Sequence, residues 1–433
     1  MHAEGRTLTP RDRRTLLLAS LGGALEFYDF IIFVFFAAVI SQIFFPPEVP
    51  EWLRQLQTFG IFAAGYLARP LGGVAMAHFG DRVGRKRMFM FSVLLMAVPT
   101  LLMGLLPTYA TLGITAPVLL LVLRVLQGAA VGGEVPGAWV FVSEHVPARR
   151  VGLACGVLTC GLTLGILLGS LMATLVNTVW TPEEVRAGVW RMPFIVGGVF
   201  GLFALWLRRY LHETPVFEAL RARRSLVQGL PIRQVLTGHG ASVVYSMIFS
   251  WLLTAGIVVV ILMTPTLAQT VYGIAAREAL WANSLATLAL AVGCVVYGMA
   301  ADRFGVLRVL WLGALWLLVA TGVLYWVLAH MPARFQSAYV LAGFFVGVVG
   351  VVPRFMVGAF PAPIRFSGIS FSYNVAYAVS GGLTPLLVVA WMRTHPQAPA
   401  YYVGAVAIVA AVAAMLAMRK QAGAAALGPE RAP

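Results

Sequence analysis

Twelve long apolar runs, separated by short breaks rich in charge, proline or glycine, constrain the fold of this 433-residue chain more than any other feature. Hydrophobic residues make up 60% of the sequence and charged residues only 11%, whereas ordinary soluble domains carry about 25% charged residues. A membrane-spanning helix needs about 20 apolar residues. The runs therefore predict an all-α membrane protein with twelve transmembrane helices, placed roughly at 15–42, 55–78, 88–107, 115–143, 152–176, 190–211, 240–265, 278–300, 308–330, 336–360, 367–392 and 400–418.

The sequence repeats itself across a polar segment in the middle of the chain. Asp81-Arg82-x-Gly84 after the second run returns 221 residues later as Asp302-Arg303-x-Gly305 after the eighth. Pro147 after the fourth run and Pro361 after the tenth are 214 residues apart. Repeated six-helix halves are a recurring plan of transporters. We therefore predict two pseudo-symmetric six-helix halves, at residues 1–211 and 240–418. A cytoplasmic linker at 212–239 would join them, and a cytoplasmic tail at 419–433 would follow the second half.

Basic residues are concentrated in alternate breaks. If the amino terminus is cytoplasmic, 22 of the 31 Lys and Arg residues fall in inner segments, 6 in outer loops and 3 within apolar runs. This bias is the positive-inside pattern, and it predicts a multi-pass protein of the bacterial plasma (inner) membrane with both termini cytoplasmic. The net charge of +15 thus indicates topology, and no aromatic-basic interleaving typical of a nucleic-acid-binding module is present.

No sequence pattern for a P-loop, a nucleophile elbow or a zinc site occurs, so we expect neither an enzyme nor a metal site. The expected coupling ion is a proton, with no other cofactor. The expected partners are a small-molecule substrate and the lipid bilayer, with no nucleic acid, and the expected oligomeric state is a monomer.

Two carboxylates interrupt the first apolar run. Glu26 and Asp29 are three residues apart, so on a helix they share one face. They follow Thr15 by 11 and 14 residues, which places them about 16–21 Å along the helix and near the membrane midplane. Ionisable groups at that depth usually mark ion pathways, and a carboxyl whose surroundings change can load and release a proton. We predict proton coupling here; the alternative is a static ion pair with Arg69 that fixes helix packing.

Further charged residues lie in the second and fourth runs. Arg124 has Gln127 one turn further on, and its planar guanidinium matches a carboxylate in bidentate geometry, so it suits either Asp29 or an anionic substrate. Glu134 approaches the midplane and is equally suited to relaying a proton or to partnering Arg69. Arg69 directly precedes Pro70, and we expect it to be structural.

The loop segment Asp81–Lys86 resembles the loop signature of the major facilitator superfamily, and Arg124-x-x-Gln127-Gly128 resembles its proton-coupling motif. The resemblance covers essentially the whole chain. Within the superfamily, six segments in order resemble the metabolite:proton symporter family, which takes up organic acids and zwitterions such as betaines: LEFYDF, RPLGG, RVLQGAAVGGE, WRMPF, ETPVF and FSYNVAYAVSGG.

The loop residues are predicted to form a conformational latch, because an acid beside the amino terminus of a neighbouring helix is favoured by the helix dipole. The alternative is that their charge only sets topology. The predicted latch comprises Asp81, Arg82, Gly84, Arg85, Lys86, Asp302 and Arg303. The chain departs from the family pattern at Ala77, where a Gly usually opens the loop signature, and at Val151, which replaces a usual Arg. In the second half, Gly358 replaces a usual Glu and Pro363 a usual basic residue. Losing both members of this charge pair indicates a coordinated change.

The resemblance and the buried charges together predict proton-coupled import of a small carboxylate-bearing metabolite, an organic acid or zwitterion, by alternating access. The proton would be carried by Asp29, Glu26, Arg124 and Glu134, and the substrate bound by Arg124, Gln127, Asn374, Tyr373 and Tyr377. The alternatives are proton-driven export of a drug or metabolite on the same fold and a membrane sensor that does not transport.

Overall fold

The chain folds into a bundle of long helices. The computed structural model describes residues 8–210, 213–222, 231–392 and 394–426, and these residues form helices and connecting turns with no strand. Within them, eleven helices are long and apolar enough to cross a membrane, and a bent pair, Pro182–Val189 with Arg191–Leu207, raises the number to as many as twelve. The predicted all-α membrane fold is confirmed.

We refer to the residues before and after the linker as the N-terminal and C-terminal halves. The N-terminal half is built from α1 (Pro10–Phe35), α2 (Ala37–Ile43), α3 (Glu51–Val83), α4 (Arg85–Leu105), α5 (Tyr109–Leu112), α6 (Thr115–His145), η1 (Ala148–Arg150), α7 (Val151–Val179), α8 (Pro182–Glu184), η2 (Val185–Val189) and α9 (Arg191–Arg208). The long helices α1, α3, α4, α6, α7 and α9 correspond in order to the first six predicted spans.

The linker contains two short helices, α10 (Pro215–Ala222) and α11 (Pro231–Gly238). The C-terminal half follows with α12 (Gly240–Ala255), η3 (Gly256–Met263), α13 (Thr264–Thr270), α14 (Ala276–Phe304), α15 (Val306–His330), η4 (Pro332–Arg334), α16 (Phe335–Val346), η5 (Gly347–Val351), α17 (Val352–Ala359), η6 (Ala362–Ile364), α18 (Arg365–Met392) and α19 (Ala398–Ala426).

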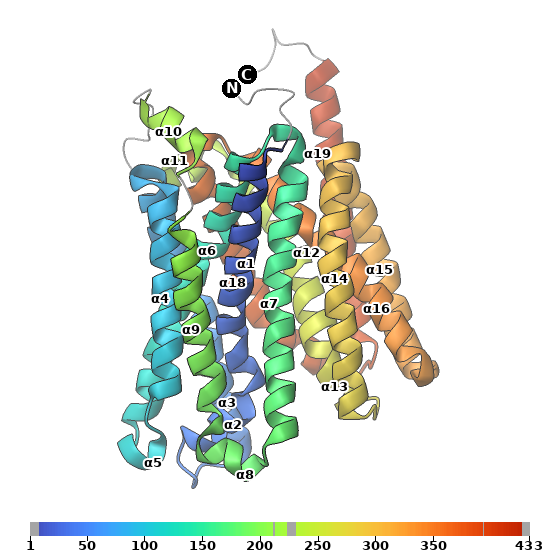
Figure 1. The fold of residues 1–433 in the computed structure, drawn as a ribbon. Helices are drawn as coiled ribbons and strands as arrows, with labels where there is room; N and C mark the ends of the chain where they lie inside the picture. The colour runs from blue at the N-terminus through green and yellow to red at the C-terminus, as the bar shows by residue number, and fades with distance from the viewer. Residues whose placement is uncertain (1–7, 211–212, 223–230, 393, 427–433) are drawn as a thin grey trace.

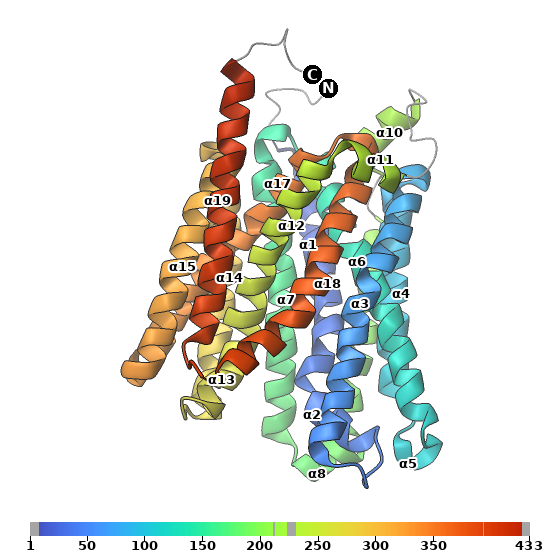
Figure 2. The same cartoon turned by 180° about the vertical axis from the view of Figure 1, so that it is seen from behind.

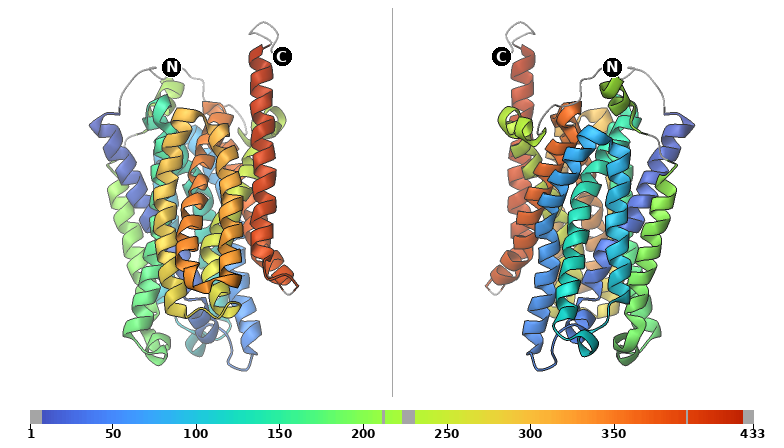
Figure 3. Two further views of the ribbon diagram at one scale, coloured as in Figure 1. Left: turned by 90° about the vertical axis from the view of Figure 1, so that its right-hand side faces the viewer. Right: turned by 90° about the vertical axis from the view of Figure 1, so that its left-hand side faces the viewer.

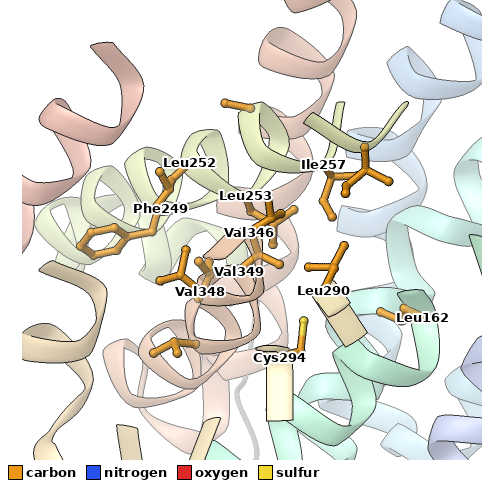
Figure 4. Close-up of a cluster of buried hydrophobic side chains, with 14 of the residues drawn as sticks. Leu162, Phe249, Leu252, Leu253, Ile257, Leu290, Cys294, Val346, Val348 and Val349 are labelled. Atoms are coloured by element: carbon orange, nitrogen blue, oxygen red, sulfur yellow. The ribbon is translucent and has the colours of Figure 1, made fainter. Parts of the chain in front are cut away.

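Two spans of the C-terminal half are not regular helices throughout. The seventh span passes through the π-helical segment η3, and the tenth through the 3₁₀ segment η5. Irregular backbone at membrane depth is tolerated where it is buried in protein, and every residue of η5 is buried. Figure 4 shows Val346, Val348 and Val349 packed among side chains of α12 and α14. The sequence predicted continuous helices here because apolar periodicity does not register such a change of winding.

The start of α1 and the end of α19 lie at one end of the bundle, which we call the termini face (Figures 1 and 3). The linker helices lie at the same face, and the short helices α2, α5, α8 and α13 lie at the opposite face. The two halves meet along two seams, one between α3 and α18 and the other between α7 and α14. These four helices therefore determine which groups of the two halves face each other.

Glycines allow the backbones of α7 and α14 to pack closely against each other. A Cβ on Gly152 would stand 2.5 Å from the carbonyl oxygen of Gly298, and one on Gly156 would overlap the carbonyl oxygen of Cys294. Small residues at such steps let helix backbones approach within the membrane. Any larger side chain at either glycine would push the halves apart.

The last helix is longer than the sequence indicated. We expected a tail from residue 419, but α19 continues to Ala426, because the segment after Met418 is rich in alanine and other good helix formers. Residues 427–433, the rest of the predicted tail, lie outside the described residues, as do 223–230 of the linker.

Candidate functional site

Asp29 is completely buried in α1, and among the described residues neither of its carboxylate oxygens has a hydrogen-bond partner. It points at α9, where two glycines make room for it. A Cβ on Gly197 would stand 2.6 Å from Oδ1, and one on Gly201 would stand 2.9 Å from Oδ2. An isolated ionised carboxylate is very costly to bury, whereas the neutral acid is far less so. The geometry therefore suits a group that binds a proton while it is enclosed.

Arg124 is completely buried in α6 and is surrounded by aromatic rings. Its Nη1 donates hydrogen bonds to the carbonyl oxygen of Phe30 at 3.1 Å and to Oε1 of Gln127 at 2.7 Å. The guanidinium carbon lies 4.2, 4.7 and 5.0 Å from the ring centroids of Phe30, Phe33 and Phe62. The Nε and Nη2 atoms have no hydrogen-bond partner in the described structure. A guanidinium presents N–H groups in a planar fork that matches a carboxylate.

A chain of polar side chains leads from Arg124 toward Asp29. Nε2 of Gln127 donates to Oγ1 of Thr100 at 2.6 Å, and the Thr100 hydroxyl donates to the carbonyl oxygen of Met96. Thr100 borders the same glycine as Asp29, since its methyl lies 3.1 Å from the Cβ position of Gly197. The direct Arg124–Asp29 pair considered from the sequence is not formed in this conformation. Gln127 and Thr100 lie between them.

Arg69 of α3 lies among tyrosine rings from both halves. Its guanidinium carbon is 5.5 Å from the ring centroid of Tyr66, 5.3 Å from that of Tyr373 and 4.2 Å from that of Tyr377. Tyr66 and Tyr377 face each other across the seam with their rings nearly parallel, 5.7 Å apart. Asp29 forms no ion pair with Arg69, because within the described part of the chain neither of its carboxylate oxygens has a hydrogen-bond partner. Arg69 instead links the halves through cation–π contacts.

Asn374 of α18 ties the same seam to α6. Its Nδ2 donates to the carbonyl oxygen of Gly132 at 2.6 Å, and Oγ of Ser370 donates to the same oxygen at 3.3 Å. Gly73 of α3 lies directly opposite, where a Cβ would overlap Nδ2 of Asn374. Asn374, Tyr373 and Tyr377 are all buried, so in this conformation they join the halves and do not line an open cavity.

A first gate, consisting of Asp81, Ser367, Glu144 and Arg365, closes the α3–α18 seam at the termini face. Oδ2 of Asp81 accepts hydrogen bonds from the Ser367 amide at 3.1 Å and from its hydroxyl at 2.9 Å. Ser367 lies in the first turn of α18, where the helix dipole favours a negative charge. Nη1 of Arg365 lies 3.1 Å from Oε1 of Glu144, whose side chain is fully buried.

A second gate closes the α7–α14 seam through similar backbone hydrogen bonds, and among the described residues it has no ion pair. The carboxylate of Asp302 accepts the amide hydrogens of Gly152 at 2.7 Å and Leu153 at 2.8 Å, in the first turn of α7. Leu153 and Ser367 are 214 residues apart, the offset that also relates Pro147 to Pro361. At that offset Glu144 corresponds to Gly358 and Arg365 to Val151. Both charges of the first gate are therefore missing from the second.

The other predicted latch residues have varied surroundings. Gly84 has a φ of +126°, and a Cβ there would stand 2.5 Å from Oε2 of Glu213. The Lys86 amide donates to the Glu213 carboxylate at 3.2 Å, and Lys86 Nζ donates to the carbonyl oxygen of Arg209 at 3.3 Å. Arg82 and Arg303 have exposed side chains.

The structure thus brings Asp81, Gly84, Lys86 and Asp302 to contacts between elements far apart in the sequence. Arg303 takes no part in the second gate, and its guanidinium lies over the ring of Phe304. The side chain of Arg85 is outside the described structure.

Glu26 and Glu134 are both buried, at 1% and 3% exposure, in α1 and α6 of the N-terminal half. Their assignment to the proton path remains a prediction. No group of three or more His, Cys, Asp or Glu side chains that suits a metal ion occurs within the described residues.

Sequence reasoning missed several residues of these sites. Glu144 and Arg365 had a usable signal, because a carboxylate near the end of an apolar run needs a partner, but Arg365 was counted only as a topology charge. Thr100, Tyr66 and Ser367 had no signal, since such residues are common in apolar helices.

Known proteins resemble this chain in sequence and in fold. Residues 19–280 match the family described as Major Facilitator Superfamily. The inner membrane metabolite transport protein YhjE of Escherichia coli is 34% identical over 94% of this chain and 92% of its own length. A putative proline/betaine transporter of Staphylococcus aureus is 31% identical over 92% of this chain and 86% of its own length.

Among solved structures, the proton:xylose symporter XylE superposes with a TM-score of 0.78 at 18% identity, covering 93% of this chain and 94% of that one. At that identity the match supports the fold alone. Together with the family match and the two relatives aligned along nearly their whole lengths, it leads to one conclusion: this chain is a membrane transporter that belongs to the major facilitator superfamily.

Proposed function

We propose that this transporter imports a small carboxylate-bearing metabolite, an organic acid or a zwitterion, together with a proton. The observation that carries the proposal is the completely buried and unpartnered carboxylate of Asp29 in a helix at membrane depth. Burial favours the protonated form of such a carboxyl group and strongly disfavours the ionised form. The ionised form becomes favourable only when water or a cation reaches the group. A transport cycle that alternately encloses and opens this position would load the proton on one side and release it on the other.

The orientation of the proposal comes from the positive-inside pattern, which makes the termini face cytoplasmic. Both gates are closed at that face, so in this orientation the conformation described here is closed toward the cytoplasm. The two halves, 1–211 and 240–418, would rock about the α3–α18 and α7–α14 seams as the gates break and re-form.

The substrate is proposed to bind near Arg124 and Arg69. Each of these buried arginines has an Nε and an Nη2 atom without a hydrogen-bond partner in the described structure. A bidentate carboxylate would satisfy both atoms of one guanidinium. The aromatic rings around Arg69 belong to both halves, so a substrate that inserts there would separate Tyr66 from Tyr377 and disturb the seam. The name of the staphylococcal relative, a putative proline/betaine transporter, supports a zwitterionic substrate.

Coupling is proposed to run through Gln127 and Thr100. Arg124 holds Gln127, Gln127 holds Thr100, and Thr100 borders the position of Asp29. If a substrate carboxylate draws the Arg124 guanidinium toward itself, the hydrogen bond to Gln127 is strained and the surroundings of Asp29 change. Proton and substrate would then be linked without direct contact.

The test is Asp29→Asn, which mimics the permanently protonated form. In proteoliposomes this variant should exchange labelled substrate across the membrane at equal concentrations. It should not accumulate substrate when the inside is made alkaline, because no proton is released inside, and the pH dependence of uptake should flatten. Proline, betaine and small organic acids are the substrates to screen first, by thermal shift of the purified protein.

Glu26→Gln is the matched control, because it neutralises the other carboxylate of the same helix. If Glu26→Gln abolishes accumulation while Asp29→Asn keeps it, the coupling residue has been wrongly chosen. If both variants still concentrate substrate, the two carboxylates are structural and Glu134 is the next residue to test.

Arg124→Lys tests the substrate role. Lysine keeps the positive charge but cannot reproduce a planar fork, nor hold Gln127 and a carboxylate at the same time. Uptake should fall by at least about tenfold, corresponding to the loss of about 1.4 kcal/mol. Near-normal uptake by this variant would rule out bidentate binding at Arg124.

A further inference from the structure

A large cavity opens at the termini face of the C-terminal half, and neither Asp29 nor Arg124 lines it. Its volume is about 1160 Å³, and it is bounded by the ends of α12, α17 and α19 and by the turn between α14 and α15. Figure 2 shows α19 continuing past the neighbouring helices at this end, where it forms one wall. The charged residues of the lining are Arg308, Arg354 and Lys420, and no Asp or Glu is among the lining residues.

Arg354 is the most enclosed of these cations. Its Nε is buried and has no hydrogen-bond partner in the described part of the chain. Asp302 is close enough for its charge to act on Arg354, but both carboxylate oxygens of Asp302 accept amide hydrogens from α7. A buried donor without an acceptor is unfavourable. The guanidinium therefore has unused capacity to bind an anion.

Gly358, one turn beyond Arg354, leaves the space in which such an anion would fit. A Cβ on Gly358 would meet a single atom, Nη1 of Arg354, at 3.3 Å. Gly358 is also the pseudo-symmetric counterpart of Glu144, which neutralises Arg365 in the first gate. The cavity thus lies where the first gate has the carboxylate of Glu144.

We propose that this cavity binds a phosphate-type oxyanion, with Arg354 contacting it beside Gly358 and with Arg308 and Lys420 at its mouth. Guanidinium groups bind phosphate through paired N–H groups, and lysine acts as a point charge. Two sources share this chemistry: the headgroup of an anionic phospholipid and soluble phosphate. The inference does not depend on the transported substrate; the phospholipid source depends on the termini face being at the inner leaflet.

The experiment measures thermal stability of the purified full-length protein in detergent at constant ionic strength. Four additions are compared: short-chain phosphatidylglycerol, short-chain phosphatidylcholine, sodium phosphate and sodium chloride. A ligand that binds the folded state raises the unfolding temperature in proportion to its occupancy. Stabilisation by phosphatidylglycerol but not phosphatidylcholine identifies a lipid headgroup, and stabilisation by sodium phosphate identifies the soluble anion.

The double variant Arg354→Gln/Lys420→Gln should weaken the apparent Kd of the stabilising anion by at least about tenfold. Its matched control is Arg233→Gln/Arg419→Gln, which removes the same charge from exposed positions that do not line the cavity. If the control loses the response equally, or if neither anion stabilises the wild-type protein more than chloride does, the proposal is wrong.

Gly358→Glu gives a second test that does not remove a cation. The new carboxylate would lie beside Arg354 and occupy the site from within, so the protein should fold normally but no longer respond to the added anion. Gly358→Gln, which has the same shape without the charge, should retain a larger part of the response. Equal responses of the two variants would show that the site does not distinguish charge, which would overturn the proposal.

Discussion

The two gates at the termini face share a backbone plan but differ in what holds them closed. In each, an aspartate at the end of one helix accepts hydrogen bonds from the first turn of a helix in the other half. The first gate adds a buried ion pair between Glu144 and Arg365, and the second replaces both residues, with Gly358 and Val151. The second gate therefore depends on main-chain hydrogen bonds and on close glycine packing.

This difference indicates that the gates do not contribute equally to the closed state. Opening the first gate separates two charges, one of which is fully buried, and breaks the contacts of Asn374 and Ser370 with Gly132. Opening the second gate breaks two charge-assisted hydrogen bonds, each worth about 1.5–3 kcal/mol, and exposes small apolar surfaces. We infer that the α7–α14 seam is the weaker of the two and separates more readily.

Arg365→Gln should have the largest effect, because it removes the guanidinium that lies 3.1 Å from the buried carboxylate of Glu144. Removing one partner of a buried ion pair typically costs about 3–5 kcal/mol. Arg365 also donates Nε hydrogen bonds to the carbonyl oxygens of Val357 and Phe360. The unfolding temperature should fall clearly, and the equilibrium should shift toward the state open at the termini face, which increases accessibility of the first gate to water-soluble reagents.

The double variant Glu144→Gln/Arg365→Gln is the control for that prediction. It removes both charges, so it should be more stable than Arg365→Gln alone although it carries one more substitution. A double variant as unstable as the sum of its single changes would show that the charges do not interact, and the proposed difference between the gates would fail.

Asp302→Asn should lower the stability of the protein less than Arg365→Gln does. It should open the second seam more than Asp81→Asn does. Asparagine offers one acceptor oxygen where Asp302 uses two, and the second gate has no ion pair within the described residues. Cys155 and Cys294 are buried in the second seam and serve as native reporters. In a Cys160→Ser background, labelling of these thiols by a membrane-permeant maleimide should rise several-fold in Asp302→Asn.

Asp81→Asn should leave that labelling close to wild type, because Glu144 and Arg365 still hold the first gate. Both variants should slow transport and change substrate affinity by no more than a few-fold, since a gate residue acts on exchange between states. Substrate binding lost with normal exchange would instead place the aspartate in the binding site. Equal labelling in the two variants would remove the distinction between the gates.

Much of the fold was predictable from the sequence, for a physical reason. In a bilayer each span must satisfy its own backbone hydrogen bonds, so apolar runs of about 20 residues specify helices almost by themselves. The repeat of Asp81 at Asp302 likewise indicated two equivalent positions in the two halves. The changes of winding in η3 and η5 were not predictable, because local apolar composition is the same in π, 3₁₀ and α segments.

The site was less predictable than the fold. The positions of Asp29, Glu26 and Arg124 within apolar runs predicted that they lie inside the membrane, and the structure buries all three side chains in the protein. It could not show that Asp29 faces the glycines of α9 and that Arg124 faces phenylalanine rings, because the direction of a side chain depends on helix rotation and on neighbours distant in sequence. The departures at Val151, Gly358 and Pro363 were visible in the sequence, which paired Gly358 with Pro363. The ion pair between Glu144 and Arg365 instead makes Gly358 and Val151 the counterparts.

Restoring the missing ion pair is the last and smallest expected effect. Gly358→Glu and Val151→Arg together would place at the second gate the charges that Glu144 and Arg365 provide at the first. Neither single change forms an ion pair across the seam. Gly358→Glu places its carboxylate beside Arg354 and should leave the closed state unchanged, whereas Val151→Arg adds a cation without an acid and should leave it unchanged or destabilise it. The pair should recover stability beyond the sum of the single effects, with a coupling of about 0.5–3 kcal/mol. A successful pair should reduce labelling of Cys155 and Cys294 below the wild-type level and slow transport, because both gates would then resist opening.

The control for this prediction is Gly358→Gln/Val151→Gln, which has similar bulk without charge and separates electrostatic from steric effects. If the neutral pair closes the seam to the same extent as the charged pair does, then added side-chain volume closes the second gate and added charge does not. The absence of Glu and Arg would then explain nothing about how the two gates differ.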